Sequence, residues 1–233
     1  MLCFFIYGAN KIYAQKGFNV GLGGSYNSVW VINQNVYGMP EIDYDKKFGT
    51  AFMLGVGYNF NEWLGLRFEL GKAALGQNYY EQNKGIVSDR KLDLKYTMIP
   101  VFLRLATTGE KAKFHIMLGP QLGILNSAEQ EYSIGNKDVA NKVKVNDYDY
   151  PIGETEITNR FEKSDLFAVL DFGLDFFFTE RLYLNASLRL NYGLTDINVA
   201  DWRIPNKDKE YKASNNAYGG LNFGLNYVLK YWY

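Results

Sequence analysis

The chain contains one histidine, His115, which is the first residue to consider for proton transfer. It follows a short polar link at 106–112, so we expect it near the end of a strand, on that strand's less bulky face. Catalysis would need a nucleophile or a second acid–base group beside it, yet the single cysteine, Cys3, lies in the N-terminal apolar stretch. We interpret His115 as a hydrogen-bonded core residue; a hydrolase or lipid-modifying enzyme that uses it is the alternative.

Acidic residues gather in one long polar segment, 128–164. Asp147, Asp149, Glu154 and Glu156 could offer oxygen ligands to a hard cation such as calcium. Their spacing does not match a calcium loop, so a solvated acidic loop is the preferred interpretation. With one histidine and one cysteine, a transition-metal centre is not expected either.

A glycine run, Gly21-Leu22-Gly23-Gly24, resembles part of a dinucleotide-binding turn. That motif needs a helix directly after it, and none is predicted here. Glycines inside a strand of a narrow barrel explain the run better. No cofactor is therefore expected.

Composition indicates which elements must position these residues. Lys and Arg number 25 and Asp and Glu number 25, so the formal net charge is +0 and no overall positive field draws the chain to nucleic acid. The 19 Tyr, 16 Phe and 23 Gly, against 5 Pro, favour strands and turns over helices. We therefore expect an all-β protein.

The N-terminus carries the features of an export signal. Residues 2–8 are a short apolar core, and Ala14, followed by Gln15, suits signal peptidase. We predict a signal peptide over 1–15 and a mature domain over 16–233, with a buried strand as the alternative for the apolar stretch. No other apolar run approaches the ~18–20 residues of a transmembrane helix, so any membrane span would be made of strands.

Alternation at every second residue recurs along nearly the whole chain and predicts about eight strands, each with one bulky and one small or polar face. The first strand, around 17–32, is weaker, and the fourth, around 91–105, changes phase between Tyr96 and Val101, which predicts a bulge near Pro100. The clearer bulky faces begin with Phe48, Phe52, Leu54 and Val56; Leu64, Leu66, Phe68 and Leu70; Phe114, Ile116 and Leu118; Leu166, Leu170 and Leu174; Leu182, Leu184 and Leu188; and Leu221, Phe223 and Leu225.

The links between these strands alternate in length. Those at 60–63, 106–112 and 179–181 are short, whereas 33–47, 72–90, 128–164 and 195–216 are long and polar. Outer-membrane barrels have short periplasmic turns and long extracellular loops. The pattern predicts a single closed antiparallel transmembrane β-barrel with both ends in the periplasm.

Volume decides which face points inward. An eight-stranded barrel has an interior that side chains or one small ligand can fill, and several large residues from every strand would overfill it. The bulky faces are therefore predicted to meet membrane lipid. A soluble lipocalin-like carrier, with the bulky faces inside, is the alternative.

Charged residues then fall on the inner face, where each needs a partner. We predict that they form a salt-bridge network that plugs the lumen, and that aromatic residues on the same face add bulk, which disfavours a porin. The predicted network comprises Arg67, Glu69, Arg104, Asp171, Asp175, Arg189 and Lys230, and the aromatic residues are Phe102, Phe167, Phe177, Tyr183 and Trp232.

Aromatic residues flank the apolar stretches and are predicted to form girdles at the two membrane interfaces. The end of the chain, with Tyr231 and Tyr233 in phase with the lipid-facing set, is typical of the aromatic signal that the barrel-assembly machinery reads. The predicted girdle comprises Trp63, Tyr79, Tyr80, Tyr192, Tyr231 and Tyr233.

The segment 94–103, with Tyr96, Ile99 and Pro100 followed by apolar residues, resembles the signature on the fourth strand of the PorT-like outer-membrane β-barrel proteins of the Bacteroidota. The Ala14-Gln15 junction, the hairpin at 55–60 and the Gly119-Pro120-Gln121 step are similar to that family too. The resemblance implies the barrel fold and an association with secretion or envelope-assembly complexes, and it implies no catalytic residues. We therefore expect a non-enzymatic envelope protein that docks with other envelope proteins through long outer loops.

Overall fold

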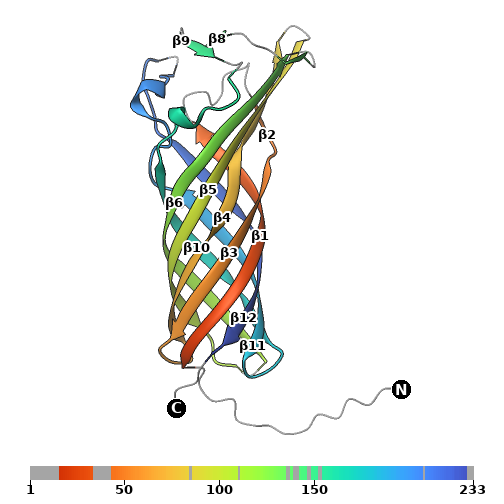
Figure 1. Cartoon of the computed structure of the whole chain (residues 1–233), viewed down its shortest axis with the longest axis vertical. Coiled ribbons are helices and arrows are strands. Elements are labelled where there is room, and N and C mark those ends of the chain that lie inside the picture. The colour runs from red at the N-terminus through yellow and green to blue at the C-terminus, as the bar shows by residue number, and fades with distance from the viewer. Residues whose placement is uncertain are drawn as a thin grey trace, which may run out of the picture.

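Eight antiparallel strands close into a ring in this computed structural model (Figure 1). The structure describes residues 16–33, 43–83, 86–109, 111–134, 137–138, 142–145, 148–151, 154–206 and 208–229. The last ring strand pairs back onto the first, which confirms the predicted all-β barrel. The ring consists of β1 (Gly17–Asn33), β3 (Phe48–Asn59), β4 (Leu64–Asn83), β5 (Ile86–Ala106), β6 (Ala112–Ile134), β10 (Ser164–Phe177), β11 (Leu182–Gly193) and β12 (Ser214–Val228).

Short and long connections lie at opposite ends of the barrel, as Figure 1 shows. The turns after β3, β5 and β10 share the end at which β1 begins and β12 ends. Side chains close two of these turns: Asn61 Oδ1 accepts hydrogen bonds from the backbone N–H of Trp63 and Leu64, and Thr179 Oγ1 accepts from Arg181 and Leu182. We call this the short-turn end and the other the long-loop end.

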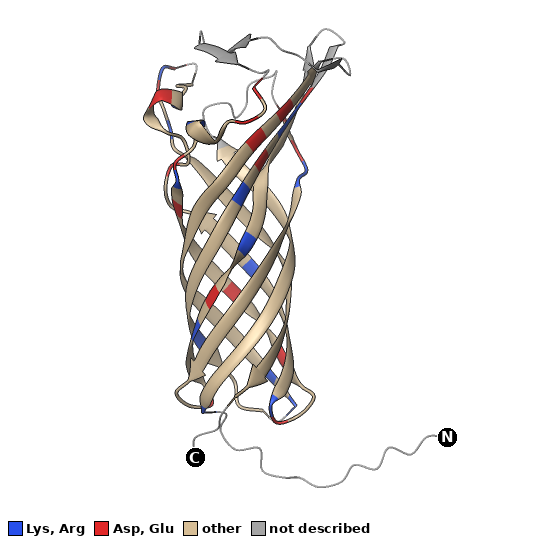
Figure 2. Ribbon diagram, viewed as in Figure 1, with Lys and Arg blue, Asp and Glu red and all other residues tan. Residues whose placement is uncertain are grey.

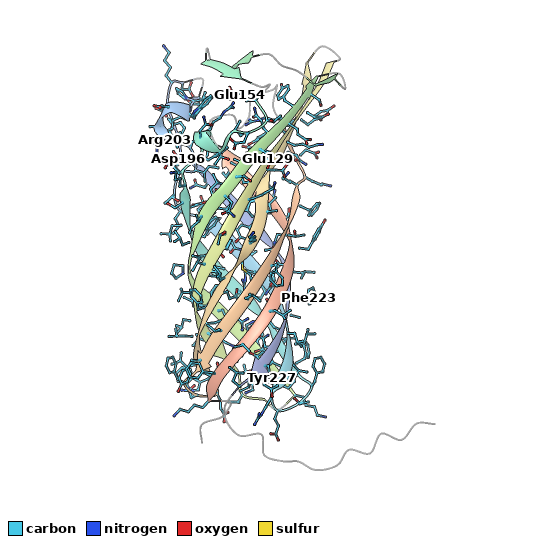
Figure 3. All side chains as sticks on the ribbon, viewed as in Figure 1. Glu129, Glu154, Asp196, Arg203, Phe223 and Tyr227 are labelled. Atoms are coloured by element: carbon cyan, nitrogen blue, oxygen red, sulfur yellow. The ribbon has the colours of Figure 1, made fainter. Side chains whose placement is uncertain are left out.

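The bulky faces point outward, away from the barrel axis. Leu54 is 53% exposed, whereas its neighbour Met53 is 7% exposed and points into the lumen. Figure 3 shows this fringe of side chains around the wall, with Phe223 and Tyr227 labelled on β12. An apolar outer wall with small and polar groups inside is the reverse of a soluble carrier.

Going once around the ring measures the stagger of the strands. The directly opposite residues run from Phe18 through Tyr58, Leu66, Leu103, Leu118, Leu170, Leu190 and Gly219 back to Ser28 on β1. The path thus returns to β1 ten residues further along. Together with the strand number, this offset fixes the narrow diameter of the barrel.

Three neighbouring strands extend beyond the rest at the long-loop end. β4, β5 and β6 have 20, 21 and 23 residues, so the loop predicted at 72–90 is wrong: most of it is strand. The outward residues of this segment are polar and made it resemble a loop, although its inward residues continue the alternation of a strand. Gly76 has φ +133°, and a Cβ there would lie 1.9 Å from the carbonyl oxygen of Leu92, so only glycine fits.

Shorter elements decorate this end. β2 (Asp43–Asp45) pairs with β4, β7 (Lys137–Asp138) pairs with β6, and β8 (Lys142–Val145) pairs with β9 (Tyr148–Pro151). Two short 3₁₀ helices, η1 (Thr158–Arg160) and η2 (Ala200–Trp202), lie in the last two long connections. Within the described ranges, no helix has the length and apolar character needed to cross a membrane.

The strand irregularity lies in β6 and not near Pro100, where it was predicted. β5 keeps one phase throughout, and its pairing with β4 passes Pro100 without a change of register. Lys95 pairs with Ser127 and Tyr96 with Leu125, so Asn126 is the extra residue of a bulge. Because β5 keeps one phase, Leu92, Leu94 and Tyr96 face the lumen on the same side as Phe102, and the change of phase predicted between Tyr96 and Val101 is wrong.

We predict that a charge on the outer wall is costly in proportion to its depth. Leu54→Arg, near the middle of the apolar band, should lower the free energy of unfolding by about 2–4 kcal/mol, and Thr50→Arg, nearer the long-loop end on the same face, by about 0–1 kcal/mol. Urea unfolding of the barrel in phospholipid vesicles measures both values. Equal costs at the two positions would contradict the proposed depth of the band.

Candidate functional site: a filled lumen beneath a loop cap

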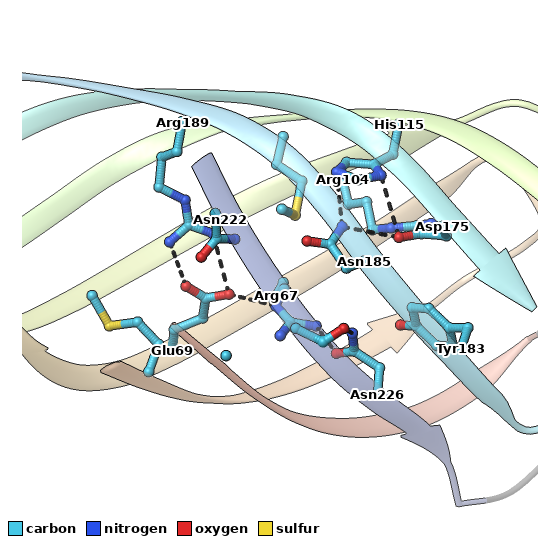
Figure 4. A pocket seen from close by; sticks show the side chains of 14 residues that line it. Arg67, Glu69, Arg104, His115, Asp175, Tyr183, Asn185, Arg189, Asn222 and Asn226 are labelled. Atoms are coloured by element: carbon cyan, nitrogen blue, oxygen red, sulfur yellow. Dashed lines mark hydrogen bonds and ion pairs between the residues drawn. The ribbon is translucent and has the colours of Figure 1, made fainter. Parts of the chain in front are cut away.

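Arg189 is the centre of the charged layer inside the barrel. Its Nη1 lies 2.7 Å from Glu69 Oε2, and its Nε lies 2.7 Å from Asp171 Oδ2. Its guanidinium also lies 4.9 Å from the centre of the Phe102 ring. These contacts join β4, β5, β10 and β11 across the lumen. Figure 4 shows the pair formed by Arg189 and Glu69.

A second group of contacts lies closer to the short-turn end. His115 is 1% exposed, and its ring lies between two carboxylates, with Nε2 3.2 Å from Asp171 Oδ1 and Nδ1 3.3 Å from Asp175 Oδ1. Only the Nε2 contact has hydrogen-bond geometry. Asp175 also pairs with Arg104 and accepts a hydrogen bond from Asn185. His115 is thus a packed member of the network, as the core interpretation expects.

Six of the seven predicted network residues meet in this layer. Arg67 Nε lies 2.6 Å from Glu69 Oε1, and its Nη1 donates to Asn226 Oδ1 at 2.8 Å. Lys230 lies outside the described residues. We use the name lumen network for Arg67, Glu69, Arg104, His115, Asp171, Asp175 and Arg189. The three arginines balance the three acids, which satisfies the requirement for burying charge.

Little space is left among these groups. The cavity that the lumen network lines, shown in Figure 4, has a volume of about 20 Å³. A water molecule needs roughly 10–15 Å³ of such volume. The charged layer therefore holds about one water and leaves no room for a solute.

An apolar layer fills the lumen toward the long-loop end. Leu94, Tyr96 and Met98 of β5 are each at most 1% exposed, and Phe167 of β10 is fully buried. Between the two layers, Gln121 Nε2 donates to the hydroxyl of Tyr218 at 2.7 Å. Phe102, Phe167 and Tyr183, which were predicted to lie inside, are all buried there. Phe177 packs on Tyr183 with ring centres 4.8 Å apart. Trp232 is not among the described residues.

Two long connections fold over this layer and close the mouth. We call residues 154–163 together with 195–206 and 208–213 the loop cap. The N–H of Glu162 donates to the carbonyl of Ile197 at 2.8 Å, and that of Val199 donates to the carbonyl of Arg160 at 3.1 Å. Ile157, Phe161 and Ile197 are the buried apolar residues of the loop cap. The bulge in β6 turns Ala128 toward the cap, where its carbonyl accepts from Ile157 at 2.9 Å.

Ion pairs and hydrogen bonds around the buried Arg160 and the partly buried Asp196 fix the shape of the loop cap. Arg160 is 2% exposed, pairs with Glu154 at 2.6 Å, and lies 4.3 Å from the centre of the Trp202 ring. Asp196 accepts hydrogen bonds from the Tyr211 hydroxyl at 2.8 Å and pairs with Arg203 at 3.0 Å. Burial, with the nearby Asp196 charge, raises the pKa of Tyr211. Figure 3 labels Glu154, Asp196 and Arg203 at this end.

The acidic residues considered for calcium have other partners where they are described. Glu154 binds Arg160, and Glu156 accepts hydrogen bonds from the hydroxyl and backbone N–H of Thr158, which lower the pKa of the Glu156 carboxyl. Asp147 and the side chain of Asp149 lie outside the described residues. In the portion of the chain that the structure describes, no three His, Cys, Asp or Glu side chains gather as a metal site would require.

The predicted girdle residues differ in their placement. Trp63, at the short-turn end, and Tyr192, toward the long-loop end, are 53% and 45% exposed on the outer wall. Tyr80 lies in the extension of β4 beside β2 and is 36% exposed. Tyr231 and Tyr233, which were also predicted as the assembly signal, lie outside the described residues.

The prediction that Tyr79 belongs to the aromatic girdle is wrong. It is buried, with its ring 5.6 Å from that of Tyr44 and beneath the guanidinium of Arg90. Adjacent residues of one strand point to opposite faces, so Tyr79 and Tyr80 cannot both face lipid.

The loop cap, as a structured unit, was not predicted from the sequence. Its fixing residues, Arg160, Asp196, Trp202 and Tyr211, are scattered through segments interpreted as polar loops. The available signal was the presence of Trp, Phe and Ile within those segments, since a fully solvated loop needs none of them.

We predict that Arg189→Met lowers the free energy of unfolding by about 3–5 kcal/mol, because it removes the cation that Glu69 and Asp171 share and leaves the lumen network with one excess buried negative charge. Adding Asp171→Asn to that variant should recover part of the loss, whereas Arg181→Met in an exposed turn should change stability by less than about 0.5 kcal/mol. Urea unfolding in vesicles measures all three variants. A loss for Arg189→Met no larger than for Arg181→Met would show that the network does not stabilise the barrel.

Comparison with known proteins places the chain among bacterial membrane barrels. A family model described as the outer membrane protein beta-barrel domain matches residues 13–199. No curated protein matches the sequence. Among solved structures, the chain is similar in fold to neisserial surface protein A, with 15% identity and a TM-score of 0.46 over 91% of this chain and 97% of that one. It is also similar to OprG from Pseudomonas aeruginosa (13% identity, TM-score 0.44, 92% and 98% covered) and to Ail, the attachment invasion locus protein of Yersinia pestis (14% identity, TM-score 0.41, 91% and 99% covered). Because the family model spans most of the chain, the protein belongs to the outer membrane protein beta-barrel domain family and is an integral β-barrel of the bacterial outer membrane.

Proposed function

We propose that this chain is a non-enzymatic outer-membrane protein that docks with other envelope or secretion components through its loop cap. The observation that carries the proposal is the filled lumen: charged, mixed and apolar layers follow one another beneath the cap. A barrel without a passage acts through its surfaces. Trp202 and Arg203 are at least partly exposed in the cap, and both residue types are enriched at protein interfaces.

We also propose that the chain lies within the PorT-like branch of the family, for which a secretion or envelope-assembly complex is the expected setting. The residues of the motif at 94–103 have structural roles in the lumen that support the proposed resemblance. Tyr96 accepts a hydrogen bond from Asn216 at 3.1 Å, and Pro100 is paired with Gln121 of the second similar motif. Recognition of Tyr231 and Tyr233 by the barrel-assembly machinery during insertion belongs to the same proposal.

Docking predicts contacts at the loop cap that are absent at the other end. A photo-crosslinking amino acid in place of Asp201, which is exposed in η2, should give a discrete crosslinked species in intact cells. The same substitution at Lys111, exposed at the short-turn end, should not give that species. Immunoblots and mass spectrometry of the adducts measure this. If Asp201, Glu154 and Lys209 all fail to crosslink to another protein, docking through the cap is excluded.

The absence of enzymatic activity is part of the proposal and has its own test. His115 is 1% exposed within the lumen network, so a lipid or peptide substrate has no evident access to it. We expect His115→Ala to leave envelope lipid and peptide profiles unchanged while lowering the stability of the barrel. A changed profile in cells that hold a normal amount of the folded variant would favour the hydrolase or lipid-modifying alternative.

A further inference from the structure

Lys72 faces the lipid side of the barrel within the apolar band of β4. The outward residues before it on the same strand are Phe68 and Leu70, which are 43% and 47% exposed. Its partner on β3 is Phe52, at 53% exposure, and its partner on β5 is Thr97. Lys72 is itself exposed, so it is a cation set among lipid-facing side chains.

The apolar band continues beyond Lys72 on neighbouring strands. Phe48 lies four residues closer to the long-loop end of β3 than Phe52, and its ring stacks on that of Tyr26 at 5.3 Å. Trp30, further along β1, is 44% exposed on the same wall. Lys72 thus lies inside the outer edge of the band, at a depth from which a lysine stem can extend its ammonium group to the headgroup layer.

The other outward lysines of this sector have protein partners. Lys91 pairs with Glu131 at 3.4 Å, and Lys95 pairs with Glu129 at 2.9 Å. For Lys72, no ion pair or hydrogen bond to another described side chain is formed. An ammonium group that extends from the apolar band into the headgroup layer meets lipid phosphates there. The anion that pairs with Lys72 is therefore expected to come from the membrane.

Neutral and charged donors lie beside Lys72 on the same outward face. The Thr97 hydroxyl and the Asn126 amide are hydrogen-bonded to each other at 3.1 Å. Lys95 is paired with Ala74, the next outward residue after Lys72. Because Glu129 neutralises Lys95, the patch formed by Lys72, Lys95, Thr97, Asn126 and Glu129 carries a net charge of one positive unit. The charge, the donors and the depth match an anionic lipid headgroup.

We propose that this patch binds the phosphate group of a phosphorylated glycolipid in the outer leaflet, with Lys72 as the charged contact and Thr97 and Asn126 as hydrogen-bond donors. The long-loop end faces the cell exterior in this family of barrels, so the headgroups at this level belong to the outer leaflet. The inference rests on the membrane placement of the barrel and is independent of docking through the loop cap.

Native mass spectrometry of the full-length protein in detergent tests the site. The probes are diphosphorylated lipid A, the same lipid A after removal of its phosphates, and phosphatidylglycerol. Wild-type protein should retain diphosphorylated lipid A, and Lys72→Gln should bind it about fivefold more weakly, which is the loss expected for one lysine at an anionic surface. Lys72→Arg should keep most of the binding. Lys91→Gln, which removes an ion-paired outward lysine, should bind like wild type.

Three results would overturn the proposal. They are equal retention of phosphorylated and dephosphorylated lipid A, unchanged binding by Lys72→Gln, and binding of phosphatidylglycerol as tight as that of lipid A, which would show that the site has no selectivity for a glycolipid. Gel mobility with and without heating verifies that each variant is a folded barrel before binding is measured. Crosslinking at Asp201 is unaffected by any of these outcomes, so the docking proposal stands or falls separately.

Discussion

The width of the lumen is the constraint on which the rest of this structure depends. Eight strands with a stagger of ten residues enclose a space that side chains alone can fill. A large side chain fits inside the lumen only where a small residue faces it. Gly55 is an example, because a Cβ at this position would lie 2.6 Å from the guanidinium of Arg67. Every remaining bulky apolar residue must point outward, and lipid is the only surrounding in which such a wall is stable.

Much of the barrel follows from two features of the sequence, period and volume. The alternation of Phe52, Leu54 and Val56 with small residues identifies a two-faced strand, and the excess of large residues on one face assigns that face to lipid. The same argument brings Arg67, Glu69, Asp171 and Arg189 to the inner face, where the structure joins them. Charge balance among residues that share a narrow space can thus be predicted without coordinates. Figure 2 marks where the Lys and Arg residues and the Asp and Glu residues lie along the ribbon.

What the sequence does not reveal is where membrane ends and strand continues. Above the apolar band, β4 and β5 reverse the ordinary signal: outward residues such as Lys91 and Lys95 are polar, and inward residues such as Leu92 and Leu94 are apolar. In the sequence this inversion resembles a change of phase along the strand. The strand keeps its phase, and what changes is the surrounding of its outer face, from lipid to water. The bulge at Asn126 is hidden for a related reason, because its effect depends on the loop that packs against Ala128.

The lumen network also constrains the order in which the barrel can be built. Glu69 and Arg189 are 120 residues apart in the chain, and Asp171 reaches its arginine only when β11 lies beside β10. Until these hairpins meet, each carries an uncompensated charge that hydrocarbon would reject. Strands cannot therefore enter the bilayer one at a time with these groups dehydrated; the inner face must stay wet until the ring is nearly complete, and water leaves the interior as its last acids and arginines come together.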